Sequence, residues 1–113
     1  VVGVLRGAEI GTTFVRDATT GRLAVSGEER LEAGDIVSVS PTLGDIHRVA
    51  NAFDDRTSIS IHLYGGNIGA IQRAVYDPDT GAEKPFVSGY SNLVVPNLWD
   101  RSADVRAGRP AAP

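Results

Sequence analysis

Residues 34–51 read GDIVSVSPTLGDIHRVAN, and this stretch decides the fold that we predict from the sequence. Ile36–Ser40 alternates apolar and polar side chains, which is typical of a half-buried β-strand, and Asp45–Asn51 predicts a second, short strand. Glycines such as Gly44 allow the tight turns that join such strands. The stretch therefore predicts two consecutive strands, and the second one carries a histidine, His47.

Short strands of the same kind are predicted on both sides of this stretch, separated by turn signals rich in Gly, Asp, Pro and Thr. The predicted strands cover residues 1–5, 8–15, 23–25, the region around Leu31, 58–64 and 70–76. No amphipathic helix is predicted. The sequence therefore predicts an all-β domain, a jelly roll or small barrel, over residues 1–100, and a flexible Pro/Ala-rich tail over residues 101–113.

Composition narrows the classes of partner and of chemistry. The chain has 113 residues, with 14 acidic and 11 basic side chains, and the basic ones are scattered, so we expect no nucleic-acid partner. The absence of cysteine excludes disulfides, cysteine zinc sites and a cysteine nucleophile within the chain, and it fits a reducing cytoplasm as the expected location. No apolar run approaches the roughly 18 residues of a membrane span, so we expect no membrane partner.

The two histidines are the first candidates for a functional site. In the predicted strand 58–64, a period of two residues places Ser60, His62 and Tyr64 on one face of the strand. Three such groups in one line could relay protons or hydrogen bonds, but they also fit a solvated face that alternates with a core face. His47, taken alone, fits a structural histidine as well as it fits a metal ligand.

Residues 34–51 resemble the second cupin motif. The motif has a glycine, a proline, a second glycine, a histidine after two further residues and an asparagine after three more. These positions are occupied by Gly34, Pro41, Gly44, His47 and Asn51. The gaps on either side of the proline are each one residue longer than usual. In a cupin such a histidine projects a metal-ligating imidazole into the mouth of the barrel.

A closer resemblance is to the cysteine dioxygenase and 3-mercaptopropionate dioxygenase family. Residues 44–51 and 60–64 carry it, because the fifteen-residue step from His47 to His62 matches the step from the family's third iron ligand to the histidine of its Ser-His-Tyr relay. The likeness extends to about Trp99. It implies a cupin fold, a double-stranded β-helix, with Fe(II) bound by three histidines, one of which is His47.

The same resemblance implies roles for the other candidates and an activity. Ser60, His62 and Tyr64 fall on the relay, so Tyr64 is the expected hydrogen-bond donor to the bound substrate or oxygen, with His62 and Ser60 fixing its orientation. The expected enzyme adds both oxygen atoms of O2 to the sulfur of a small carboxylate-bearing thiol, cysteine or 3-mercaptopropionate, and so forms a sulfinic acid.

Two stretches resemble the bacterial mercaptopropionate-type branch of that family. Residues 65–69 read GGNIG where the mammalian-type enzymes have Ser-Pro-Pro, and residues 85–92 read PFVSGYSN. In this branch an arginine nine residues beyond the relay tyrosine lies near the substrate, and Arg73 occupies that position. A guanidinium pairs well with a carboxylate, although Arg73 also fits an ordinary surface arginine on a strand.

The first cupin motif is represented only by its last glycine, Gly7. The other two iron-binding histidines are therefore expected upstream of Val1, outside this sequence. Residues 1–5 are accordingly expected to form a strand with an unpaired apolar edge, which favours self-association. A non-catalytic cupin that binds a ligand or serves as a scaffold, and an inactive fragment, are the alternatives. The sequence does not indicate an oligomeric state.

Overall fold

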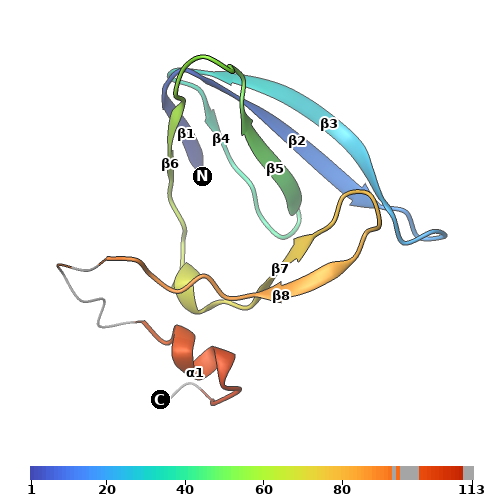
Figure 1. Cartoon of the computed structure of the whole chain (residues 1–113), viewed down its shortest axis with the longest axis vertical. Helices are drawn as coiled ribbons and strands as arrows, with labels where there is room; N and C mark the ends of the chain where they lie inside the picture. Colours follow the sequence, from blue (N-terminus) through green and yellow to red (C-terminus); the bar gives the residue numbers. More distant parts are fainter. Residues whose placement is uncertain (93, 95–99, 111–113) are drawn as a thin grey trace. The chain divides into compact units, whose positions relative to one another are not determined.

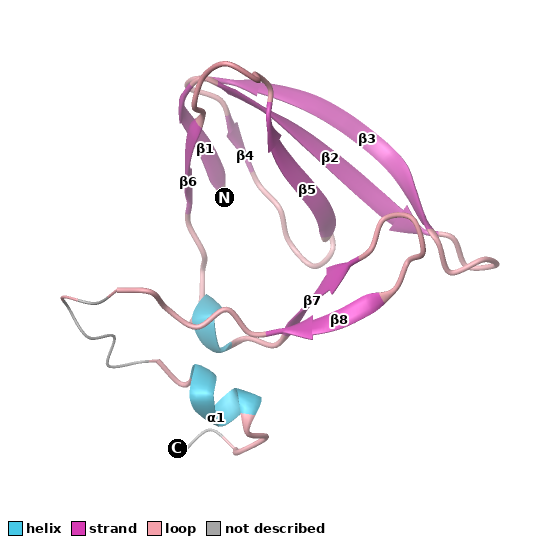
Figure 2. Cartoon of the chain, in the orientation of Figure 1, coloured by secondary structure: helices cyan, strands magenta, loops and turns pink. Residues whose placement is uncertain are grey.

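The computed structural model describes residues 1–92, 94 and 100–110 of the chain. The chain divides into two compact units, Val1–Leu63 with Pro78–Gly81, and Tyr64–Asp77 with Ala82–Pro113. Antiparallel strands make up most of the regular structure (Figures 1 and 2). The prediction of an all-β fold is therefore confirmed.

The first unit consists of two three-stranded antiparallel sheets, with the orders β4-β1-β6 and β3-β2-β5. The strands are β1 (Val2–Arg6), β2 (Ala8–Arg16), β3 (Leu23–Glu32), β4 (Ile36–Val37), β5 (Ile46–Asn51) and β6 (Ile59–His62). The chain changes sheet at every connection except the β2–β3 hairpin. In the part of the chain that is described, the two sheets do not join into a closed barrel.

The β2–β3 hairpin turns where the sequence predicts a loop. Asp17 accepts hydrogen bonds from the backbone N–H groups of Thr19 and Thr20, each at 2.8 Å, and the Asp17 N–H donates to the Arg22 carbonyl oxygen at 2.9 Å. Gly21 adopts φ +72°, a conformation in which glycine avoids the clash of a Cβ atom. The loop therefore forms through an aspartate turn that ends on a glycine.

The expectation that residues 1–5 form an unpaired edge is wrong. β1 is the central strand of its sheet, because the chain returns twice to pair with it, through β4 and through β6. The core of the first unit forms around it: Val2 and Val4 are buried, together with Ala8 and Leu31. The argument for self-association through the edge of this strand therefore does not hold.

The predicted strand over residues 36–40 is shorter than expected. Only Ile36–Val37 pairs with β1, and the chain then makes a tight turn in which Ser40 and Leu43 exchange backbone hydrogen bonds of 2.8 and 3.0 Å. Pro41 lies inside this turn and has no N–H group to donate to a neighbouring strand. β5 then begins at Ile46, close to the predicted start of the strand.

The second unit combines a β-hairpin with two short helical segments. Its elements are the 3₁₀ helix η1 (Ile68–Ala70), β7 (Arg73–Tyr76), β8 (Glu83–Phe86) and α1 (Ser102–Arg106). The predicted strand over residues 70–76 begins only at Arg73, because η1 occupies the preceding residues. α1 lies in the segment expected to be a flexible tail, where the Asp100 side chain accepts a hydrogen bond from the Ser102 N–H at 2.9 Å. Trp99 and residues 111–113 lie outside the described residues.

Candidate functional site

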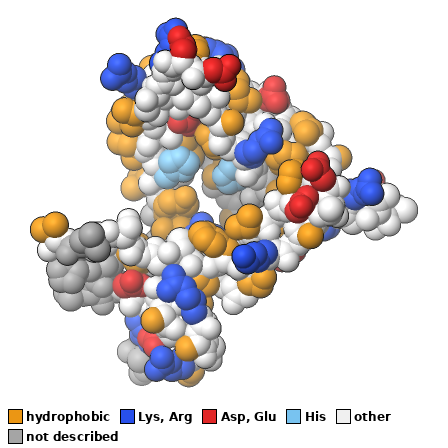
Figure 3. All heavy atoms as spheres, viewed as in Figure 1, with side chains coloured by type: hydrophobic (Ala, Val, Ile, Leu, Met, Phe, Trp, Pro, Cys, Tyr) orange, Lys and Arg blue, Asp and Glu red, His pale blue; other side chains and the backbone are white. Residues whose placement is uncertain are grey.

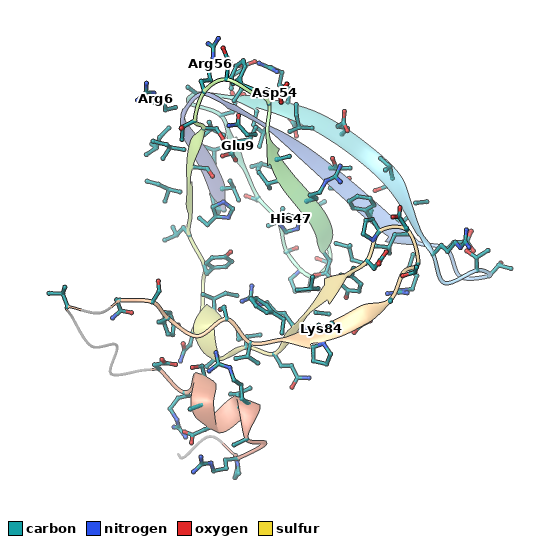
Figure 4. All side chains as sticks on the ribbon, in the orientation of Figure 1. Arg6, Glu9, His47, Asp54, Arg56 and Lys84 are labelled. Atoms are coloured by element: carbon teal, nitrogen blue, oxygen red, sulfur yellow. The ribbon has the colours of Figure 1, made fainter. Side chains whose placement is uncertain are left out.

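His47 lies on β5, at the side of a cavity in the first unit. Pairing of β5 with β2 places His47 opposite Thr13. The cavity has a volume of about 400 Å³ and is lined by residues of both sheets. Figure 4 shows the position of His47 on β5. Its apolar lining consists mainly of Val2, Leu31, Val37, Val39 and Val49. One imidazole is therefore presented to a small, largely apolar space, which is the usual character of a ligand pocket.

The His47 ring is held in one tautomer by the backbone before it. Its Nδ1 atom lies 3.0 Å from the Gly44 carbonyl oxygen and 3.3 Å from that of Asp45. A carbonyl oxygen only accepts hydrogen bonds, so Nδ1 carries the proton and the Nε2 atom of the neutral ring keeps its lone pair. A histidine that binds a metal through Nε2 is commonly held in this way. Gly44, at φ +63°, makes the turn that directs its carbonyl oxygen at the ring.

His47 therefore fits the role of one imidazole ligand. Within the residues that the structure describes, no group of three or more His, Cys, Asp or Glu side chains is placed to hold a metal ion. The triad that the family resemblance implies needs two further histidines, and apart from His47 this chain contains only His62. One of the three imidazoles that the resemblance implies is thus present in this chain.

Ser60 and His62 lie together on β6. Their register with β1, Val4 opposite Ser60 and Val2 opposite His62, puts both on the same face of the sheet as the two buried valines. The Ser60 Oγ atom lies 3.2 Å from the His62 Nε2 atom, and the tautomer of the ring decides which of them donates the hydrogen bond. Histidine side chains are visible among hydrophobic ones at the surface in Figure 3.

The other face of the same sheet is apolar and open. Ile59, Ile61 and Leu63 are 46%, 56% and 68% exposed. On the face of the buried valines, Ser60 is half-buried and His62 is exposed. Both faces of the strand therefore reach solvent in the described residues, and the solvated-face interpretation of these polar side chains stands beside the relay.

Tyr64 is placed differently from the other two relay residues. β6 ends at His62, and pairing continues for one residue, as the Leu63 N–H donates to the Val1 carbonyl oxygen at 2.8 Å. Tyr64 is the first residue of the second unit and is 49% exposed. The structure therefore brings Ser60 and His62 together on one strand. Tyr64 belongs to the second unit, and its position is described only within that unit.

Arg73 lies at the start of β7 and is held by β8 and the residues after it. Its Nη2 atom donates a hydrogen bond to the Ser88 Oγ atom at 2.9 Å. Its guanidinium carbon lies 5.2 Å from the centroid of the Phe86 ring, the residue opposite it in the hairpin. The Nε atom is buried, and none of the described residues forms a hydrogen bond with it. These contacts distinguish Arg73 from a surface arginine whose side chain is free to move.

Sequence reasoning missed two contacts of the candidate residues and one buried carboxylate. The Gly44 carbonyl oxygen and the Ser88 hydroxyl each fix a candidate residue. Glu9, which does not line the cavity, is 6% exposed, and its Oε2 atom has no hydrogen-bond partner among the described residues. Glu9 had a signal in the sequence, because it is the only charged residue of the predicted strand over residues 8–15. The other two contacts depend on turn geometry and hairpin register, which composition does not reveal.

The chain matches no model of a known protein family. No helix in the described part of the chain is long and apolar enough to cross a membrane.

Proposed function

We propose that this chain carries part of the cupin barrel of an iron-dependent thiol dioxygenase. The substrate is a small carboxylate-bearing thiol, 3-mercaptopropionate or cysteine, and the product is its sulfinic acid. The observation that carries the proposal is His47, whose Nδ1–H is held by the Gly44 carbonyl oxygen while the ring borders a cavity of about 400 Å³. His47 is the residue at which the spacing resembles the family, and its hydrogen bond leaves Nε2 available to bind a metal.

The strand arrangement of the first unit supports a jelly-roll fold. In a jelly roll the chain winds between two facing antiparallel sheets, so that consecutive strands alternate between them. The orders β4-β1-β6 and β3-β2-β5 follow this rule at every connection except the β2–β3 hairpin. Further strands added at the open edges of β5 and β6 would extend both sheets toward a barrel.

The residues of this chain have distinct roles in the proposed reaction. His47 would supply one of three imidazole ligands, and the Gly44 carbonyl oxygen keeps its Nδ1 protonated so that the Nε2 lone pair is available to a metal. Bound Fe(II) would favour the thiolate form of the substrate over the thiol and would activate O2. Other groups of the protein orient the substrate and exclude water from the site.

Tyr64, His62 and Ser60 form the proposed relay. Tyr64 donates a hydrogen bond to the substrate during the reaction, and His62 fixes its direction. Ser60 holds the His62 ring, since their Oγ and Nε2 atoms are 3.2 Å apart. Such a preorganised donor stabilises developing charge without needing to reorient when the reaction occurs.

The cavity suits a small substrate. A volume of about 400 Å³ is at the lower end of ligand pockets, and its valine and leucine lining favours the methylene and sulfur atoms of a thiol. The carboxylate of the substrate needs a separate cationic partner, and Arg73 has the chemistry for that pairing. The cytoplasm is the proposed location, because a chain without cysteine has no disulfide that would need an oxidising compartment.

Oxygen uptake by the iron-loaded full-length protein tests the proposed function. An oxygen electrode should record consumption that depends on 3-mercaptopropionate or cysteine, and mass spectrometry should find a product that is heavier than the thiol by two oxygen atoms. A thiol lacking the carboxylate, such as cysteamine, serves as the comparison substrate. Iron-loaded protein that consumes no oxygen with any of these thiols would contradict the proposal.

A further inference from the structure

Arg73 is held in place by two contacts, one with Phe86 and one with Ser88. The β7–β8 hairpin aligns Arg73 with Phe86, and the chain continues two residues further to Ser88. The ring of Phe86 covers one face of the guanidinium, with 5.2 Å between the guanidinium carbon and the ring centroid, and Ser88 accepts a hydrogen bond from Nη2 at 2.9 Å. One contact fixes the plane of the guanidinium and the other fixes its rotation within that plane.

Most of the N–H donors of this guanidinium have no partner within the part of the chain that the structure describes. A guanidinium has five N–H groups, and the bond to Ser88 uses one of them. The Nε atom has no hydrogen-bond partner, and no carboxylate among the described residues forms an ion pair with Arg73. A fixed, unneutralised positive charge with unused donors is suited to a planar anion with two oxygen atoms, which is a carboxylate.

We infer that Ser88 is a positioning residue that sets the specificity for carboxylate-bearing thiols. By holding Nη2, the Ser88 hydroxyl keeps the remaining N–H groups of Arg73 in one orientation, ready to receive the substrate carboxylate. This inference rests on the proposed function, which assigns the carboxylate to Arg73. The inference adds that Ser88, by orienting Arg73, makes the site prefer a carboxylate over other anions.

Ser88 is suited to a test because its side chain carries little of the fold. It is exposed and lies beyond the end of β8, so its hydroxyl contributes nothing to the four paired positions of the hairpin. Replacing Ser88 with Ala removes the bond to Nη2 and lets the arginine side chain sample other rotamers. We expect the KM for 3-mercaptopropionate to rise about 3- to 10-fold, the effect of losing one hydrogen bond of ordinary strength, because the lost bond orients the arginine and does not itself contact the substrate.

The first experiment compares two substrates in the iron-loaded full-length protein. Ser88→Ala should raise KM for 3-mercaptopropionate with little change in kcat, and should leave KM for cysteamine unchanged, because cysteamine lacks the carboxylate. Ser88→Thr keeps the hydroxyl and should restore the KM of the original protein. Ser91→Ala, an exposed serine three residues away, is the matched control and should change neither substrate's KM. Equal changes for both substrates, or no change, would overturn the inference.

A second experiment separates this inference from the proposed function. Side-chain NMR of the Arg73 Nε–H group is followed while propionate, a carboxylate without a thiol, is added to this chain, with propionamide as the neutral control. The signal should shift with propionate alone, in the original chain and in Ser88→Thr, and much less in Ser88→Ala. If the full-length protein oxidises no thiol, the proposed function fails and this titration still decides the role of Ser88. Equal shifts in the original chain and Ser88→Ala, or no shift in either, would show that Ser88 positions nothing.

Discussion

Gly69→Ala is the substitution whose cost is most directly determined by the structure. Gly69 is buried in η1, and a Cβ atom built there would lie 2.3 Å from Cε2 and 2.6 Å from Cδ2 of the Tyr90 ring. Carbon atoms do not approach so closely, so the ring must move. Tyr90 is anchored by a hydrogen bond from its hydroxyl group to the Asn67 side-chain oxygen, and a displaced ring loses that bond.

The expected destabilisation combines these two effects. Overpacking a well-packed site costs about 1–3 kcal/mol, and losing one hydrogen bond costs about 0.5–1.5 kcal/mol. Tyr90 is 36% exposed, so its ring can move toward solvent and avoid part of these costs, and Gly69→Ala should lower the free energy of unfolding by about 1–3 kcal/mol. Hydrogen exchange of the Gly89 N–H, which donates to the Gly69 carbonyl oxygen at 2.9 Å, reports the local effect. Denaturant unfolding followed by circular dichroism reports the effect on the whole chain.

Two further variants make the test specific. Gly65→Ala is the matched control, because a Cβ at Gly65 meets no atom within 4 Å, and it should be neutral or slightly stabilising. The double variant Gly69→Ala with Tyr90→Ala removes the clashing ring, so the cost of the alanine at position 69 should largely disappear in that background. Gly69→Ala and Gly65→Ala with equal stability would refute the close packing of Tyr90 on η1.

The remaining predictions concern the tautomer of His47, the relay and the β2–β3 loop. At pH about 8, where an imidazole is neutral, nitrogen NMR should find the His47 proton on Nδ1; a proton on Nε2 would mean that the Gly44 carbonyl oxygen does not orient the ring. Tyr64→Phe in the full-length protein should keep its iron and lose about 10- to 1000-fold in turnover, and unchanged kinetics would remove Tyr64 from the relay. Hydrogen bonds from the backbone N–H groups of Thr20 and Thr19 lower the pKa of Asp17, so its support of the loop is present above an ordinary aspartate pKa and is lost as the pH falls through the lowered value. A carboxyl titration by NMR should place the Asp17 pKa below that of a model peptide, and Asp17→Asn should remove the acid dependence of the loop signals.

The sequence predicts strands well where an alternating pattern coincides with a turn signal. The predicted strand over residues 8–15 appears as β2, Ala8–Arg16, and the predicted strand over 45–51 appears as β5, Ile46–Asn51. β2 is followed by Asp17 and β5 ends at Asn51, and both of these residue types favour turns, so local chemistry marks where each strand stops. β8 was not predicted, because Glu83–Phe86 shows no alternation and contains a proline. Glu83–Phe86 nevertheless forms a strand, because it pairs with β7 in the hairpin.

Alternation identifies the two faces of a strand but not which of them is covered. Ile59, Ile61 and Leu63 form an apolar set, and the sequence alone does not tell whether another layer packs on it. In the described residues they are exposed, whereas on the face of Val2 and Val4 Ser60 is half-buried and His62 is exposed. The contact of Arg73 with Ser88 was unpredictable for a related reason, since fifteen residues separate the two and only the register of the hairpin brings them together.

The central claim is that His47 ligates iron through Nε2, and iron content tests it most directly. Elemental analysis of the purified full-length protein should find close to one iron per chain, and His47→Ala should lose most of it, because two remaining ligands hold Fe(II) poorly. His62→Ala is the matched control: it removes the other histidine of this chain and should keep its iron, since His62 is assigned to the relay. Stoichiometric iron in His47→Ala would show that His47 is a structural residue and would contradict the account.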